Sequence, residues 1–174
     1  MKKRLLLVIA LVAALSLVAA APVSADGDKP INGKMELNLE LAPCTDGRFV
    51  TWVGTVVIDG TTYGWADFPT ADDRFDKKFM YFEEYWRIFT LEPGEDPTVA
   101  LACDNGLVVL DGINDGRGTA GGSAQADGTV ESGYGPFADV DPGSRMIWRG
   151  KITNFKEDTL DLKFKATLHI FPLK

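Results

Sequence analysis

The sequence has very few of the side chains that bind metals or carry out hydrolysis. It contains one histidine, His169, and two cysteines, Cys44 and Cys103, among 174 residues. These three side chains do not complete the four-ligand sphere of a zinc site. Residues 111–116 resemble a calcium loop only weakly, because Ile113 stands at a ligand position. Neither a Gly-x-Ser-x-Gly elbow nor a phosphate-binding Gly-Lys-Ser/Thr loop is present. We therefore expect no metal, no cofactor and no catalytic triad.

Long apolar runs are also scarce, and the single one is at the start. Residues 5–21 are apolar, follow the basic cluster at residues 2–4, and precede small residues that end at Ala25. This order is typical of a secretory signal peptide. An uncleaved anchor is the alternative, because the run approaches the roughly 20 residues that cross a bilayer. We predict a removed signal peptide (residues 1–25), a flexible lead-in (26–33), one domain (34–174), a secreted location and no stable membrane insertion.

Positive charge is in the minority. The chain has 18 Lys and Arg against 25 Asp and Glu, which gives a net charge of −7 at pH 7. Removal of the signal peptide would take away the basic cluster and leave the exported chain more acidic. An acidic surface repels phosphate backbones and anionic lipids. The composition therefore argues against a nucleic-acid partner.

The two cysteines indicate a disulfide, because exported proteins meet an oxidising environment. Cys44 and Cys103 are 59 positions apart. A bond that closes a loop of this size is worth about 4 kcal/mol by chain-entropy estimates. The alternative is a pair of buried free thiols.

Two-residue alternation is what the sequence has in quantity. Apolar residues occupy every second position in residues 35–41, 50–58 and 160–170, which is typical of half-buried strands. Residues 78–91 contain six aromatic residues and are expected to form one long strand. Residues 71–78 are the one stretch compatible with a helix, and they are too short to form one securely.

Turn signals separate these strands. Asp-Gly is among the strongest hairpin cues, and we expect hairpins at Asp59-Gly60 and Asp127-Gly128. Short strands without a long amphipathic helix indicate an antiparallel barrel or sandwich. Glycine is dense between residues 112 and 150, and glycines in strands permit the bends that closure requires. We therefore predict an all-β fold with a single antiparallel barrel.

A motif pattern supports this expectation. It runs from Gly54-Thr55-Val56 to Tyr63-Gly64, continues through residues 116–130, and closes with Gly135-Pro136-Phe137-Ala138-Asp139-Val140, Gly143 and Trp148-Arg149-Gly150. The pattern resembles the exported bacterial relatives of the allene oxide cyclase and dirigent barrels over residues 50–153. The resemblance implies about eight antiparallel strands around a central cavity. Some members of these groups are cyclases or guide coupling reactions, and many have no known activity. No catalytic residue of the two named groups matches a position here.

The candidate site residues lie on apolar strand faces. Glu84 shares a face with Met80, Phe82, Trp86 and Ile88. A carboxyl group in such surroundings has its pKa raised by desolvation, which suits a general acid or base. Alternatively, Glu84 pairs with an arginine or lies at the barrel rim. The residues proposed to line a ligand cavity are Trp52, Phe82, Trp86 and Trp148, with plain core packing as the alternative.

Three functions remain open from the sequence. The first is a secreted binding protein that holds a small apolar or aromatic ligand in the barrel. The second is a cofactor-free isomerase or cyclase of the allene oxide cyclase type, in which Glu84 polarises or deprotonates the substrate. The third is an extracellular structural or interaction module whose barrel is filled. Whether the protein is an enzyme is not decided by the sequence.

Overall fold

Strands account for nearly all the regular structure, as the two-residue alternation predicts. The computed structural model describes residues 29–70, 74–76, 79–119, 121–153 and 162–173, so the predicted signal peptide lies outside the described residues. The elements are β1 Ile31–Pro43, β2 Phe49–Ile58, β3 Thr61–Pro69, β4 Arg74–Asp76, β5 Phe79–Phe89, α2 Val99–Cys103, η1 Asn105–Leu107, β6 Val108–Thr119, β7 Ser123–Gly133, η2 Gly135–Phe137, β8 Arg145–Thr153 and β9 Lys163–Phe171.

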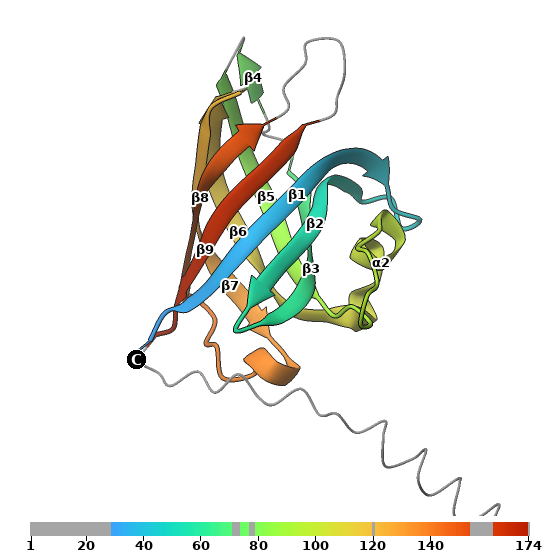
Figure 1. Ribbon diagram of the computed structural model, residues 1–174, viewed down its shortest axis with the longest axis vertical. Helices are drawn as coiled ribbons and strands as arrows, with labels where there is room; N and C mark the ends of the chain where they lie inside the picture. The colour runs from blue at the N-terminus through green and yellow to red at the C-terminus, as the bar shows by residue number, and fades with distance from the viewer. Residues whose placement is uncertain (1–28, 71–73, 77–78, 120, 154–161, 174) are drawn as a thin grey trace, which may run out of the picture.

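The strands form a closed antiparallel barrel, which confirms the predicted fold class (Figure 1). Each long strand pairs with its neighbour in sequence, and β3 pairs directly with β5. Pairing of β1 with β9, from Ile31 opposite Ile170 to Asn38 opposite Lys163, closes the ring. Eight strands therefore make the wall, while β4 pairs with β5 outside the ring. Closure removes the exposed strand edges that an open sheet would leave.

One face of each strand forms the interior. The predicted long strand at residues 78–91 is confirmed as β5, and its alternate residues Trp86 and Ile88 are buried in the core. Trp52, Trp65, Trp86 and Trp148 all belong to this core. Val50, which the sequence grouped with Trp52, instead packs in a separate outer cluster. The register of β1 and β2 shifts between Leu39 and Ala42, close to this position.

Only one of the two expected Asp-Gly hairpins is present. Asp59 and Gly60 form the β2–β3 turn with φ values of 48° and 81°. The expected hairpin at Asp127-Gly128 is wrong, because both residues lie inside β7. A Cβ on Gly128 would lie 2.1 Å from the carbonyl oxygen of Ile113. Glycine is therefore required here by the close approach of β6, and not by a turn.

Aromatic rings cover other glycines on neighbouring strands. Phe82 lies opposite Gly116, and Trp86 lies opposite Gly112. A Cβ on Gly116 would lie 1.9 Å from the Phe82 ring, and one on Gly112 would lie 2.6 Å from the Trp86 ring. The glycine-rich wall of β6 thus makes room inside the barrel for the large rings of β5.

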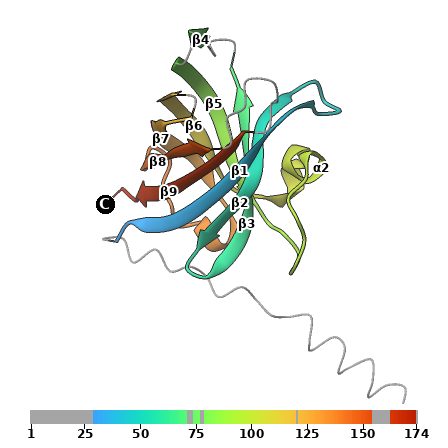
Figure 2. The same cartoon turned by 45° about the horizontal axis from the view of Figure 1, so that its top comes forward.

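The two ends of the barrel differ. At one end η2 brings Phe137 into the core, where its ring lies 5.4 Å from that of Tyr63. The other end is where β1 finishes and where β2 and β5 begin, as Figure 2 shows from a second direction. There the core-facing rings of Trp52 and Phe82 are only partly buried. The core is therefore partly exposed to solvent at this end.

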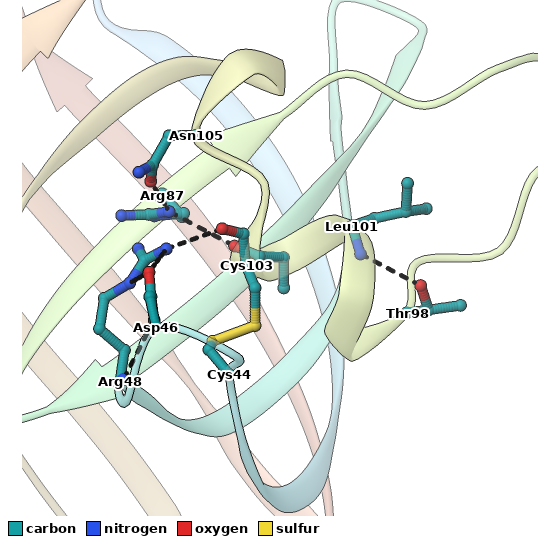
Figure 3. The surroundings of a disulfide bond; sticks show 9 residues. Cys44, Asp46, Arg48, Arg87, Thr98, Leu101, Cys103 and Asn105 are labelled. Carbon is teal, nitrogen blue, oxygen red and sulfur yellow. Dashed lines mark hydrogen bonds and ion pairs between the residues drawn. A yellow bond between two sulfur atoms is a disulfide. The ribbon is translucent and has the colours of Figure 1, made fainter.

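A second, smaller core lies outside the barrel wall beneath α2. The predicted disulfide is confirmed: Cys44, just after β1, is bonded to Cys103, the last residue of α2 (Figure 3). Arg48 and Arg87 both lie against the ring of Phe68, with centroid distances of 5.1 and 4.5 Å. We call the following set the outer cluster: Cys44, Val50, Val53, Ala66, Phe68, Phe89 and Ala102.

Candidate functional site in the barrel interior

Aromatic rings form a continuous layer near the accessible end of the barrel. The Phe82 ring stacks on Trp148 at 5.5 Å, and Trp148 meets Phe164 edge-on at 4.7 Å. Phe164 in turn lies 6.2 Å from Trp52. These four residues, Trp52, Phe82, Trp148 and Phe164, are the aromatic layer. The structure therefore brings together three of the four predicted ligand-lining residues, and it adds Phe164, which the sequence analysis missed.

Trp86, the fourth predicted residue, lies in a different part of the interior. Its ring stacks on that of Trp65 at 5.2 Å with an interplanar angle of 7°. Two residues before Trp86 along the same strand face is Glu84. Trp86 therefore lies beside Trp65 and close to Glu84, and it is not part of the aromatic layer.

Glu84 is buried inside the barrel, with 2% of its surface exposed. The hydroxyl group of Thr51 donates to Glu84 Oε1 at 3.0 Å and lies 3.2 Å from the carbonyl oxygen of Asp67. The side chain is thus buried, although Glu84 is directly opposite Pro69, the last residue of β3. The hydrogen bond from Thr51 therefore links Glu84 of β5 to β2, which lies on the far side of β3.

A second carboxyl group, Asp67, joins Glu84 in the interior. Asp67 is 3% exposed and accepts a hydrogen bond from Trp65 Nε1 at 2.9 Å. It stands on β3 directly opposite Trp86 of β5, two residues from the position opposite Glu84. Two carboxyl groups, on the adjacent strands β3 and β5, are therefore buried in the barrel interior.

Asn114 completes the group and is directly opposite Glu84 across β5 and β6. It is 1% exposed, and neither Nδ2 nor Oδ1 has a hydrogen-bond partner within the described part of the chain. The buried indole Nε1 atoms of Trp86 and Trp148 also have no hydrogen-bond partner among the described residues. We call Thr51, Asp67, Glu84 and Asn114 the polar cluster.

Sequence reasoning missed most of the polar cluster for an identifiable reason. Asp67 alternates with Tyr63 and Trp65 along β3, and Asn114 alternates with Gly112 and Gly116 along β6. A strict two-residue reading of these segments would have placed both polar residues inside. The Asp-Gly pairs at 111–112 and 115–116 have the sequence that is typical of turns, although both lie within β6.

A pair of charged groups with shifted pKa values lies on the outer side of the wall, apart from the interior site. Asp111 and Arg87 are directly opposite each other on β6 and β5. Desolvation raises the pKa of Asp111, while Arg87 and a hydrogen bond with Ser132 oppose this shift. Desolvation also lowers the pKa of Arg87. This pair adjoins the outer cluster and takes no part in the interior site.

No family model, no curated protein and no solved structure matches the chain. Within the described segments no cluster of three or more His, Cys, Asp or Glu side chains is arranged to hold a metal ion. The same segments contain no helix that is long and apolar enough to cross a membrane.

Proposed function

We propose that the barrel binds a small, mostly apolar or aromatic ligand that carries one polar group. The observation that supports this is Asn114, whose buried amide has no hydrogen-bond partner within the described part of the chain. In native proteins such groups nearly always have partners. A ligand group that both donates and accepts, such as an amide, a carboxylic acid or a hydroxyl, would satisfy this side chain.

The cost of the polar cluster favours a binding role over a filled, purely structural barrel. Each buried polar group without a partner destabilises a fold by about 1–3 kcal/mol. Well-packed apolar residues in place of buried charged groups are often neutral or stabilising. A barrel built only for stability would therefore have an apolar side chain at position 114. The amide of Asn114 at this buried position supports recognition of a polar group.

The aromatic layer supplies the apolar part of the proposed site. Trp52 and Phe82 are core-facing and partly exposed at the accessible end. Binding sites for small ligands are mostly apolar and aromatic, with a few placed polar groups. In this proposal the ligand enters past Trp52 and Phe82, its body contacts the aromatic layer, and its polar group points toward Asn114.

The decisive experiment compares two asparagine variants. Protein purified from its own host is examined by native mass spectrometry, and the neutral probe N-phenyl-1-naphthylamine is titrated in parallel by fluorescence. We expect a co-purifying small molecule in the unmodified protein and in Asn38→Leu, whose site is an exposed position on β1. Asn114→Leu is expected to lose that molecule while it still binds the probe.

Two results would contradict this proposal. Retention of the molecule by Asn114→Leu would mean that Asn114 does not recognise it. Absence of both a bound molecule and saturable probe binding would mean that side chains fill the barrel. The second result would favour the structural or interaction module instead.

A cofactor-free isomerase or cyclase is the second candidate, and the placement of Glu84 favours it. A buried carboxyl group that accepts a hydrogen bond from Thr51 is positioned to transfer a proton to or from a substrate. Glu84→Gln keeps the size of the side chain and removes its acid–base function. A simple binder should lose little affinity, whereas an enzyme should lose about 100-fold or more in rate. Asp67→Asn is the matched control for removal of an interior carboxyl group.

A further inference from the structure

A groove on the outer face of the barrel forms a second candidate site, away from the interior. It has a volume of about 450 Å³ and crosses strands β5 to β8. Figure 2 shows these strands side by side on the wall away from α2. Sites for small ligands usually measure roughly 300–1,000 Å³. The groove is therefore large enough for a specific ligand.

The strand register explains why a groove is present. Its floor is the main chain at four directly paired positions, Met80, Gly118, Ala124 and Gly150. The side chains at these positions face inward or are absent, so nothing fills the outer surface above them. One side of the groove is the directly paired row Tyr81, Arg117, Gln125 and Arg149, and the other includes Phe79, Thr119 and Ser123.

The groove is positively charged although the chain is acidic. Its lining contains Arg117 and Arg149 and no Asp or Glu, in a chain with 25 acidic and 18 basic residues. Neither guanidinium group forms an ion pair or hydrogen bond with another described residue. Asp127, whose charge interacts with Arg149, is engaged in a two-bond contact with Arg145. Both groove arginines are therefore available to bind anionic groups.

The spacing of the two arginines suggests an extended ligand. They stand on β6 and β8, with Gln125 of β7 between them. Two strand spacings amount to about 9.5 Å. Guanidinium groups bind carboxylates through paired hydrogen bonds. Two carboxylates of one ligand, separated by a comparable distance, would occupy both arginines.

Exposed aromatic rings border the same groove. Phe79 and Tyr81 are 55% and 50% exposed at its β5 end. Tyr81 is directly opposite Arg117. Gln125, Thr119 and Ser123 add amide and hydroxyl groups that donate and accept hydrogen bonds. The lining therefore combines aromatic faces, neutral polar groups and two cations, which matches a ligand with rings, hydroxyl groups and carboxylates.

We propose that this groove binds a linear acidic polysaccharide whose sugar rings carry carboxylates. A peptide strand is disfavoured because the groove crosses the strands of a closed barrel and offers no free strand edge. Nucleic acid is disfavoured because its dense phosphate charge is repelled by the acidic remainder of the protein. A sugar chain with more widely spaced carboxylates meets less of this repulsion.

The test measures binding to oligogalacturonate and to neutral dextran at 0.15 M salt. Wild type should bind oligogalacturonate saturably and should not bind dextran. Arg117→Ala with Arg149→Ala should weaken binding at least 10-fold. The charge-matched control, Lys34→Ala with Lys163→Ala, changes two exposed lysines that do not line the groove. This control should weaken binding less than twofold.

Further variants separate the contributions of ring stacking and of guanidinium geometry from that of charge. Tyr81→Ala should weaken binding several-fold, whereas Tyr85→Ala, an equally exposed tyrosine of β5 outside the groove, should not. Replacement of both arginines by lysine keeps the charge and removes the paired hydrogen bonds. The affinity of this variant should therefore lie between that of wild type and that of Arg117→Ala with Arg149→Ala. An equal loss of affinity in Arg117→Ala with Arg149→Ala and in the control Lys34→Ala with Lys163→Ala would overturn the proposal. Binding of single-stranded DNA as tightly as oligogalacturonate would also overturn it. Circular dichroism of each variant verifies the fold.

Discussion

Loss of the disulfide should lower stability by an amount that the loop length sets. Replacement of both cysteines by serine removes a bond between residues 59 positions apart. The loop-closure entropy of such a cross-link is worth about 4 kcal/mol at 25 °C. With a urea dependence of about 2 kcal/mol per M, the unfolding midpoint should fall by about 2 M. Equilibrium urea unfolding, followed by tryptophan fluorescence, measures this shift.

The structure indicates that the variant still folds. Other contacts hold α2 to the wall: Arg48 Nη2 donates to the carbonyl oxygen of Cys103 at 2.7 Å, and Arg87 Nη1 donates to Asn105 Oδ1 at 2.9 Å. Both are visible in Figure 3. The barrel core itself includes neither cysteine. We therefore expect native far-ultraviolet circular dichroism in the variant despite its lower midpoint.

A second variant separates loop entropy from local damage to α2. Thr98 caps this helix, since its Oγ1 accepts a hydrogen bond from the backbone of Leu101. Thr98→Ala should cost at most about 1 kcal/mol, or roughly 0.5 M urea. If the cysteine variant lowers the urea midpoint no more than Thr98→Ala does, the entropic reasoning is refuted. The disulfide would then have stabilised only the helix α2.

Three further predictions concern the barrel wall. Gly128→Ala should lower the unfolding free energy by several kcal/mol, because its Cβ would overlap the backbone of β6. Gly47→Ala, at φ 88° with nothing within 4 Å, should lower it by about 1–2 kcal/mol. Thermal melts rank the two variants. Trp86→Ala should cost about 3–5 kcal/mol, because its buried ring stacks on Trp65 and its removal leaves a cavity; urea unfolding measures this loss, and a cost below 1 kcal/mol would contradict it. The pKa of Asp111 is raised in the folded state, so its protonated form stabilises the fold, and this contribution is lost as pH rises from about 4. The unfolding free energy of wild type minus that of Asp111→Asn should therefore be smaller at pH 7 than at pH 3. A difference that does not change with pH would contradict the assignment.

The sequence by itself determined several of the strands and the fold class. Alternation in residues 160–170 corresponds to β9, and the aromatic run at residues 78–91 corresponds to β5. These predictions succeeded because half-buried strands must place apolar side chains at every second position. The disulfide was also predictable, since the chain has only two cysteines. The predicted signal peptide and the resemblance to the allene oxide cyclase and dirigent barrels stay predictions.

Only the tertiary structure decided what the glycines do and which polar residues meet. Asp-Gly is compatible with both a tight turn and a crowded strand, so the sequence could not distinguish Asp59-Gly60 from Asp127-Gly128. The difference lies in the backbone of β6, which leaves no space for a Cβ at Gly128. Likewise, Asp67 and Asn114 are near Glu84 in the interior because of the registers of β3 with β5 and of β5 with β6, and Thr51 of β2 is hydrogen-bonded to it. Inter-strand register depends on contacts between residues far apart in sequence, and alternation within one strand carries no information about it.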